Sequence, residues 1–389
     1  MGGKMSRTEP SVAYLDHSTQ PGGAQLALAR LLTAELTPRI LVLPPQNIGE
    51  SGAYSDLLGS TKHKLVFVGC EQSEGATTKQ GLATLFTFGK QLVRQAFAIR
   101  RSEVFNEATV LHANSARAAL YGALACFGTK KRLVVHLRDM VDPVSLGKIG
   151  FYIFRLVALA RADAVIANSN STLASAEPYL KPAVIRAVIP SPIGIREPSR
   201  PGVIAVEAKR FGMVARIDTW KGHETVIRAF ATAFRGTDKQ LLFAGDAFFG
   251  KESLKNELVA LASSLNIASQ VTFLGHVKDV QKFIESLDVC LHASTRPEPL
   301  GQNVLQYLKL GLPTIAAAAG GPAEWITSDV NGVLVPMGDV TRLSDAMLSL
   351  SNDYNKRKQL ALEAAKTPGI LTDYEVCARH NALYERLLS

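Results

Sequence analysis

The chain has 389 residues, of which 47% are hydrophobic and 20% charged, and it carries a formal net charge of +9. This length exceeds what one typical hydrophobic core organises and predicts two domains, while the composition is that of a globular chain and excludes a disordered one. The four cysteines are far apart in the sequence and form no CxxC pair, so they imply neither a zinc site nor a disulfide framework (Cys70, Cys126, Cys290 and Cys377).

The positive charge is unevenly distributed along the chain. Residues 1–189 hold 21 basic and 13 acidic side chains, whereas residues 190–389 hold 22 and 21. A basic half indicates an anionic partner, such as a phospholipid surface or an anionic acceptor, and no nucleic-acid-binding signature is present. The first ten residues are polar and no apolar run is long enough to span a membrane. We therefore expect a cytoplasmic protein, able to bind peripherally to the inner face of the cell membrane.

The first half alternates short apolar strands with helices. A turn at Gly22 and Gly23 follows the first strand and opens an amphipathic helix at about Ala24, and such glycines let the backbone approach a ligand. His112 and His136 each stand at the end of a strand, where open α/β sheets hold ligands, although a single histidine there is more often structural. The predicted strands are 11–15, 39–43, 64–69, 108–111, 132–137 and 164–167.

The predicted helix at residues 81–101 interleaves basic and apolar side chains. Its cations include Lys90, Arg94, Arg100 and Arg101. This pattern is typical of a helix on a membrane surface, but it also fits a helix that covers a sheet and extends its cations into water. The sequence leaves both interpretations open.

A segment rich in proline and glycine at residues 191–202 separates two series of strands and helices. It divides the chain into an N-terminal domain of residues 1–190 and a C-terminal domain of residues 191–372, followed by an amphipathic helix, 373–389, able to pack back on the first domain. In the second domain the predicted strands are 203–206, 210–214, 240–245, 271–274, 289–291 and 313–317. We predict an α/β fold with two Rossmann-like, doubly wound domains facing an interdomain cleft.

The stretch from Arg296 to Gly321 contains a loop, a helix and a buried strand. Pro297 and Pro299 exclude a helix before residue 300, and Gly311 with the proline that follows ends it. A helix that starts in a loop at a strand's carboxyl end offers N–H groups and a positive dipole end to a phosphate.

Several side chains accompany this helix start. Glu298 precedes the start at Leu300 and Gly301, and Gln302 and Gln306 lie within the helix. Acid and amide groups beside an anion-binding helix end suit a polyhydroxylated phosphate ester such as a nucleotide sugar. An ordinary α/β loop with a glutamate on the surface would have the same sequence pattern.

Arg216 and Lys221 are five residues apart in the loop after an earlier strand of the second domain. Two such cations can neutralise a diphosphate, since arginine offers a planar fork and lysine a point charge. Together with the helix start near Leu300 they predict an anion site directed at a leaving group. The alternative is a pair of solvated loop cations.

Several segments, in this order and spacing, resemble the second domain of retaining glycosyltransferases of the GT-B fold, family 4: GMVARIDTWKGHETVIRAF, LLFAG, VTFLGHV, RPEPLGQNVLQYLKLGLPTIAAAAGGPAEWI and VNGVLVP. Weaker similarity in the first domain lies in PGGAQ, VLHANS, VVHLRD and ADAVIANS. The resemblance covers nearly the whole chain. It implies a metal-independent retaining transferase without a cofactor, which takes a nucleoside-diphosphate sugar as donor and a glycan, lipid-linked or small-molecule acceptor in glycoconjugate synthesis.

The resemblance also implies roles for single residues. Arg216 and Lys221 would bind the donor diphosphate, and Glu298 would meet the hydroxyls of the transferred sugar. His136 would lie beside the reacting sugar. The remaining donor-binding positions would be Gly22, Gly23, Val277, Leu300, Gly301, Gln302 and Gln306.

One departure from the family pattern concerns Gln306, which stands where the family has a second glutamate that commonly binds ribose. An amide can bond a hydroxyl but lacks the stronger charged acceptor. A catalytically silent relative that binds a nucleotide sugar or a partner enzyme is therefore an alternative. Further alternatives are a different enzyme of this architecture, such as an epimerase or phosphorylase, and a nucleic-acid binder suggested by charge alone.

Overall fold

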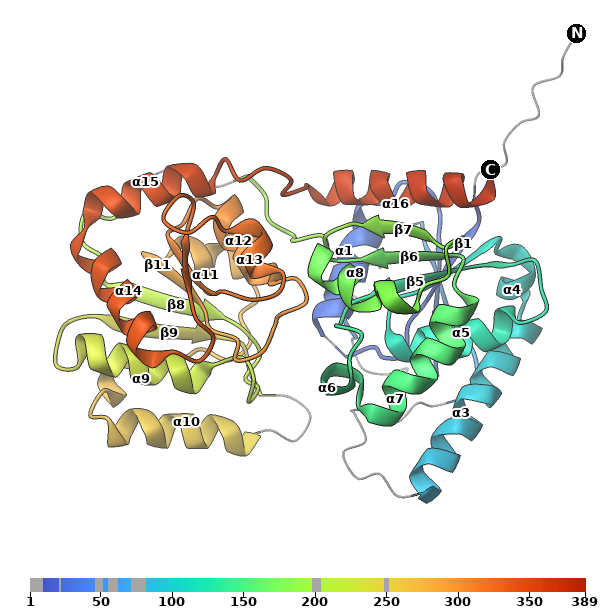
Figure 1. Ribbon diagram of the computed structural model, residues 1–389, viewed down its shortest axis with the longest axis horizontal. Helices are drawn as coiled ribbons and strands as arrows, with labels where there is room; N and C mark the ends of the chain where they lie inside the picture. The colour runs from blue at the N-terminus through green and yellow to red at the C-terminus, as the bar shows by residue number, and fades with distance from the viewer. Residues whose placement is uncertain are drawn as a thin grey trace, which may run out of the picture. The chain divides into compact units, whose positions relative to one another are not determined.

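The computed structural model describes residues 10–20, 22–45, 52–54, 62–70, 82–197, 204–247 and 252–389. The chain divides into two compact units, of which the first comprises Met1–Pro192 with Leu371–Ser389 and the second Ile193–Ile370. Each unit contains one parallel sheet with helices on its faces (Figure 1). The predicted α/β architecture with two Rossmann-like units is confirmed.

The sheet of the first unit has seven strands in the order β3-β2-β1-β4-β5-β6-β7. This order reverses direction beside β1, as in dinucleotide-binding folds, in which ligands bind at the carboxyl ends of the neighbouring strands. The strands are β1 Val12–Leu15, β2 Ile40–Leu43, β3 Lys64–Phe67, β4 Val110–Ala113, β5 Arg132–Leu137, β6 Ala164–Ala167 and β7 Ile185–Val188.

Helices cover both faces of this sheet, because successive side chains of a strand point to opposite sides. Ala13 and Leu15 pack into one cluster with α3 and α5, whereas Val12 and Tyr14 pack into another with α1 and α16. The helical segments are α1 Gly23–Ala34, α3 Leu82–Arg101, α4 Glu103–Glu107, α5 Ala116–Cys126, α6 Pro143–Leu146, α7 Lys148–Ile153, the π-helix η1 Phe154–Leu159, α8 Asn170–Ala176, the 3-10 helix η2 Glu177–Tyr179 and α16 Asp373–Leu388.

The C-terminal helix α16 belongs to the first unit and lies over its strands in Figure 1. It begins with a capping box, in which the Thr372 hydroxyl accepts from the Glu375 N–H and the Glu375 carboxylate accepts from the Thr372 N–H. This reciprocal pair satisfies two backbone donors that a helix start leaves over. The capping box fixes where α16 starts.

A buried polar network joins α16 to the sheet. The Tyr384 hydroxyl lies 2.7 Å from Nδ1 of His112 and donates to the Tyr14 hydroxyl at 3.0 Å. Nε2 of His112 in turn lies 3.0 Å from Nδ1 of His136, and Nδ1 of His380 lies 2.9 Å from the carbonyl of Val376. Burial lowers the pKa of His380 to about 4 and holds that of His112 and that of His136 well below the usual range. The three imidazoles are therefore neutral at pH 7.

Substituting Tyr384→Phe should destabilise the first unit, because it leaves Nδ1 of His112 and the hydroxyl of Tyr14 buried without their partner. The expected loss is about 1–3 kcal/mol of unfolding free energy, measured by denaturant titration. The matched control is Tyr374→Phe on the same helix, where the ring is 67% exposed and the change should stay within about 0.5 kcal/mol. Equal stability of the two variants would contradict the anchoring role of the network.

The sheet of the second unit has six strands in the order β10-β9-β8-β11-β12-β13, again with the reversal beside its first strand. The strands are β8 Arg210–Val214, β9 Gln240–Ala244, β10 Val271–Phe273, β11 Val289–His292, β12 Thr314–Ala317 and β13 Val333–Val335. The expected strand at residues 203–206 does not form where the structure describes it. The helices are α9 His223–Phe234, α10 Glu252–Ser264, the 3-10 helix η3 Ala268–Gln270, α11 Val280–Glu285, α12 Gln302–Lys309, α13 Pro322–Trp325, α14 Val340–Asn352 and α15 Tyr354–Ala364.

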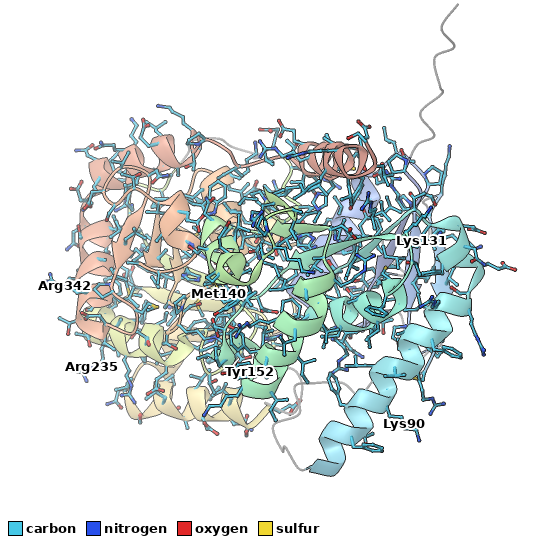
Figure 2. All side chains as sticks on the ribbon, turned by 45° about the vertical axis from the view of Figure 1, so that its right-hand side comes forward. Lys90, Lys131, Met140, Tyr152, Arg235 and Arg342 are labelled. Carbon is cyan, nitrogen blue, oxygen red and sulfur yellow. The ribbon has the colours of Figure 1, made fainter. Side chains whose placement is uncertain are left out.

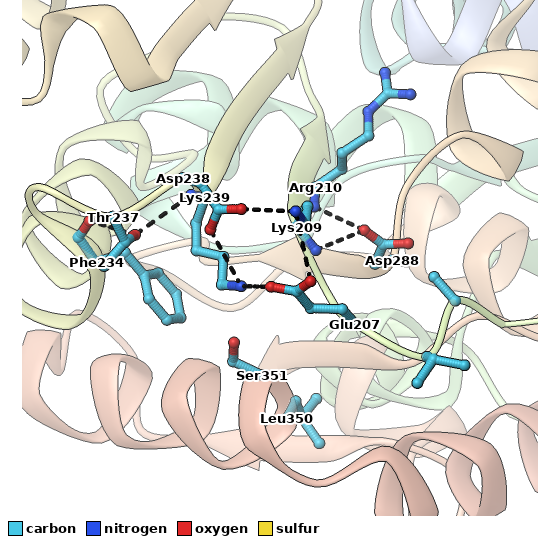
Figure 3. A network of polar contacts seen from close by, with 12 residues as sticks. Glu207, Lys209, Arg210, Phe234, Thr237, Asp238, Lys239, Asp288, Leu350 and Ser351 are labelled. Carbon is cyan, nitrogen blue, oxygen red and sulfur yellow. Dashed lines mark hydrogen bonds and ion pairs between the residues drawn. The ribbon is translucent and has the colours of Figure 1, made fainter.

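Charged residues at the amino ends of β8, β9 and β11 pair with one another (Figure 3). The carboxylate of Asp288 accepts the backbone N–H groups of Lys209 and Arg210 at 2.8 and 2.7 Å. Lys209 also pairs with Asp238 at 2.7 Å, and Lys239 with Glu207 at 2.7 Å. Charge at this edge of the sheet is thus largely compensated within the unit.

Candidate functional site

The loop after β8 carries the first group of predicted site residues. Arg216 and Lys221 lie in it, and Gly222 ends it as the capping residue of α9. Gly222 has a φ of +80°, and a Cβ there would lie 1.8 Å from the carbonyl oxygen of Ala293. Only glycine lets the loops after β8 and β11 approach so closely. Lys221 is thereby held next to the end of β11.

Lys221 and Glu298, 77 residues apart, form an ion pair. Nζ of Lys221 lies 2.7 Å from each carboxylate oxygen of Glu298, and the two side chains are 19% and 12% exposed. Burial alone would raise the pKa of Glu298, but the Lys221 ammonium and His292 hold it below its usual range. Glu298 is therefore ionised at pH 7. The sequence placed both residues in one site, and the structure brings them into direct contact.

Arg216 lies in the same loop but contacts a different carboxylate. Its guanidinium lies 3.2 Å from Oδ2 of Asp218, which is buried, while Arg216 itself is 37% exposed. Asp218 also accepts the N–H of Thr219 at 2.8 Å, which shapes the turn that precedes Lys221. The two predicted cations thus flank one loop, each beside its own acid.

The helix predicted near Leu300 begins at Gln302, with Gly301 as the capping residue at a φ of +71°. It ends at Lys309, and Gly311 follows with a φ of +66°, as the sequence predicted. Two side chains fix its start against β8. Asn303 Nδ2 donates to the carbonyl of Val214 at 3.0 Å, and the Tyr307 hydroxyl accepts the Val214 N–H at 2.7 Å. The amino end of α12 therefore lies at the carboxyl end of β8, where helix dipole and N–H groups favour an anion.

The side chain of Gln306 is buried and hydrogen-bonded within the second unit. Its side chain is 5% exposed, and Nε2 donates to the carbonyl of Ile193 at 2.8 Å. The amide thus ties α12 to the segment at which the second unit begins. Val277, the predicted base contact, packs beside a cluster that includes Phe283 and Leu287. A ribose role for Gln306 and a base contact for Val277 stay predictions.

The first unit carries the other predicted residues. Gly22 caps α1 and Gly23 is the first residue of that helix. His136 is 2% exposed and points to the face covered by α16, because it alternates on β5 with Val135, which faces the opposite side. The proposed positions of Gly22, Gly23 and His136 near a donor sugar stay predictions.

A polar network that was not predicted from the sequence lies at the carboxyl ends of β1, β4 and β5. Asp16 is fully buried and accepts from Tyr54 at 2.7 Å and from Asn114 at 2.5 Å. Arg138 donates twice to Oδ1 of Asn114, at 3.1 and 2.7 Å, and once to the Ser191 hydroxyl at 2.7 Å. Asp16, Asn114 and Arg138 each follow a strand directly, and that position was the available signal.

Electrostatics keep this network charged. Burial alone would raise the pKa of Asp16, but contacts with His17, Asn114 and Tyr54 hold it below its usual range. Burial lowers the pKa of Arg138 to about 10, which still leaves the guanidinium protonated at pH 7. An ionised acid and a protonated guanidinium thus share Asn114 at the crevice predicted by the strand order.

Among the described residues, the group close enough together to share a metal ion is His112, His136 and His380, whose nitrogens lie within 4.8 Å of one another. Both nitrogens of His112 already have partners, in Tyr384 and His136, and Nδ1 of His380 faces the Val376 carbonyl. These contacts indicate that the three histidines form a hydrogen-bonded part of the core.

Two units with the same reversed strand order, and an acid–cation pair beside a helix start at the carboxyl edge of the second sheet, define a protein of the GT-B fold. Residues 196–367 match the model of the family Glycosyl transferases group 1. This match lies within the second unit, Ile193–Ile370.

Solved structures support the fold over the whole chain. The structure of HepE from Anabaena in complex with UDP and glucose has a TM-score of 0.79 and 24% identity, covering 97% of this chain and 100% of that one. Sucrose-phosphate synthase from Thermosynechococcus elongatus has a TM-score of 0.79 and 17% identity, covering 98% and 99%. At these identities the likeness establishes the fold.

Curated relatives match over a shorter stretch. The lipopolysaccharide core biosynthesis glycosyltransferase LpsE of Rhizobium meliloti is 30% identical over 147 residues, which are 38% of this chain and 41% of that protein. The N-acetyl-alpha-D-glucosaminyl L-malate synthase of Bacillus anthracis is 28% identical over 164 residues, 42% of this chain and 40% of that protein. The chain thus matches about two fifths of the length of these relatives.

Substituting Gly222→Ala should destabilise the second unit and displace Lys221, because the new Cβ would meet the Ala293 carbonyl at 1.8 Å. Gly236→Ala is a matched control, since Gly236 has nearly the same φ, +79°, and no atom of the described residues lies within 4 Å of an added Cβ. The control should lose about 1 kcal/mol from backbone strain alone, and Gly222→Ala distinctly more, in denaturant unfolding. Equal losses would mean that the close approach of the two loops is not needed.

Proposed function

We propose that the protein is a metal-independent retaining glycosyltransferase that moves a sugar from a nucleoside-diphosphate sugar to an acceptor hydroxyl. The observation that carries the proposal is the contact of Lys221 with Glu298 beside the amino end of α12. A cation and a helix start suit a diphosphate, and an ionised carboxylate suits the hydroxyls of a sugar.

The charges in the site match the charges of the reaction. Breaking the bond between sugar and phosphate builds positive charge on the anomeric carbon and negative charge on the leaving diphosphate. Lys221, Arg216 and the N–H groups at the start of α12 would stabilise the departing diphosphate, as pre-organised donors do in an oxyanion hole. The Lys221 ammonium has three hydrogens, and two short contacts to Glu298 leave one for a phosphate oxygen.

Retention has two routes, and the site favours one of them. A double displacement needs a carboxylate nucleophile under the anomeric carbon. Glu298 is a poor candidate, since both of its oxygens accept from Lys221 and Oε2 also accepts from Ser294. The proposal is therefore attack by the acceptor on the face from which the diphosphate leaves, with that phosphate taking the acceptor's proton.

Relatives support a donor and an acceptor class. HepE was solved with UDP-glucose, LpsE is named for biosynthesis of the lipopolysaccharide core, and WaaB is named as a galactosyltransferase of the lipopolysaccharide outer core. We therefore propose a nucleotide-sugar donor, UDP-linked in the first instance, and an acceptor in cell-surface polysaccharide or glycolipid synthesis. The second candidate function is a protein that binds the donor without transferring its sugar. It is supported by the hydrogen bond from the Gln306 amide to the carbonyl of Ile193.

Purified protein incubated with UDP-, GDP- and ADP-sugars and acceptor glycans should release a nucleoside diphosphate. Lys221→Ala should lower the rate on the order of 100-fold, because it removes one charge-stabilising donor. Lys239→Ala is the control, since Lys239 pairs with Glu207 at the opposite edge of the same sheet, and should keep the parental rate. Parental turnover in Lys221→Ala would sink the assignment, and donor binding without release in the parent would favour the silent candidate.

A surface on α3 supports peripheral binding to an anionic membrane. Phe86, Val93 and Phe97 are 77%, 60% and 53% exposed, and Lys90 and Arg94 stand between them in the sequence. The opposite side of the helix packs into the core through buried residues such as Leu92 and Ile99. Figure 2 shows Lys90 directed away from α3 into solvent. Within the described residues, no helix is long and apolar enough to cross a bilayer.

The double variant Phe86→Ser/Phe97→Ser should lose sedimentation with vesicles containing phosphatidylglycerol at low salt, because it removes the exposed apolar contacts between the cations. Tyr374→Ser, at an equally exposed ring on α16, is the control and should sediment as the parent does. Equal binding of the parent to neutral phosphatidylcholine vesicles, or to neither kind, would contradict an anionic-membrane partner.

A further inference from the structure

Glu298 is held from the side of β11 by two buried residues that the proposed chemistry does not yet use. Ser294 Oγ lies 2.8 Å from Oε2 of Glu298, and Nε2 of His292 lies 3.1 Å from Ser294 Oγ and 3.6 Å from the same Oε2. Ser294 and His292 are 1% and 3% exposed. His292 is the last residue of β11, so the chain of contacts starts on a rigid strand.

The direction of the hydrogen bonds that join His292, Ser294 and Glu298 follows from the number of hydrogens available. An ionised carboxylate only accepts, so the single hydroxyl hydrogen of Ser294 goes to Oε2 of Glu298. In the contact with His292, the Ser294 oxygen is then the acceptor, and the imidazole of His292 is the donor. This requires a hydrogen on Nε2 of His292. Nδ1 of His292 is buried and has no hydrogen-bond partner among the described residues. The direction of donation is therefore fixed from His292 through Ser294 to Glu298.

This chain makes the two oxygens of Glu298 unequal. Oε2 accepts from Lys221 and from Ser294, with the His292 ring close by, whereas the described residues supply Oε1 with a donor from Lys221 alone. Oε1 thus keeps the larger capacity to accept a further hydrogen bond. The loop itself is fixed near Lys221, since the N–H of Thr295 donates to the Trp220 carbonyl at 2.8 Å.

We propose that Ser294 and His292 are positioning residues that hold Oε2 of Glu298, so that Oε1 is presented to a hydroxyl of the donor sugar. The inference rests on the proposed function. When the diphosphate draws on the Lys221 ammonium, the pair with Glu298 weakens, and Ser294 with His292 keeps the carboxylate in place. The two residues therefore act on recognition of the sugar and leave recognition of the diphosphate to Lys221, Arg216 and α12.

The test compares binding of nucleoside-diphosphate glucose with binding of the free diphosphate, by calorimetry on the full chain, using the UDP, GDP and ADP forms. Ser294→Ala should weaken binding of the nucleotide sugar about tenfold, since one hydrogen bond to a charged group is lost, and should leave binding of the free diphosphate unchanged. His292→Phe should weaken it in the same direction by a smaller factor. Ser294→Thr, which keeps the hydroxyl, should restore the parental value, and Ser344→Ala, at a buried serine on α14, is the control.

Transfer assays add a readout that a merely structural role would not move. Parent protein should discriminate against a monodeoxy sugar donor that lacks the bound hydroxyl, and Ser294→Ala should lose most of that discrimination. Parental binding and discrimination in Ser294→Ala would overturn the inference, as would an equal loss for sugar and free diphosphate. If the parent binds nucleotide sugar but transfers none, the proposed function fails while the binding comparison still decides the roles of Ser294 and His292. Absence of any nucleotide-sugar binding in the parent would overturn both.

Discussion

The ion pair between Lys221 and Glu298 is the contact on which the second unit's site depends. It joins the loop after β8 to the loop after β11, two strands that lie side by side in the sheet. Both loops must come close for the pair to form, and Gly222 permits this where any side chain would meet the Ala293 carbonyl. Because each charge is partly buried, either one alone would be costly to keep out of water. The strand order, the glycine and the two charges therefore make one arrangement.

Much of this arrangement follows from sequence, because parallel strands end at a common edge and the chain marks those ends with polar residues and glycines. The extent of α12 was predictable from Pro299 and Gly311, and the shared location of Arg216, Lys221 and Glu298 followed from the loops that carry them. The hydrogen-bond partners of individual side chains were not predictable from the sequence. Gln306 bonds the Ile193 carbonyl, 113 residues away, and Arg138 bonds Asn114, 24 residues away. Such choices depend on rotamers and on packing between distant elements, which local patterns do not encode.

The two units use polar groups differently at the same topological position. In the second unit the carboxyl edge of the sheet presents a partly exposed acid–cation pair beside a helix start. In the first unit, the corresponding edge holds the buried Asp16 and Asn114 and the half-buried Arg138 in a series of hydrogen bonds. The edge in the second unit keeps donors and acceptors within reach of a ligand, whereas the donors and acceptors at the edge in the first unit bond to one another. His136 faces neither, since its place on β5 turns it towards α16.

The membership of α16 in the first unit has a consequence for the order in which the protein is completed. Residues 371–389 complete, together with α1, the cover of one face of a sheet made from residues 12–188. At typical rates of synthesis the ribosome needs about 10–40 s to add the second unit before that cover emerges. Until then the hydrogen-bonded contacts of Tyr14 and His112 with Tyr384 of α16 cannot form. The half that is translated first is therefore the half that matures last.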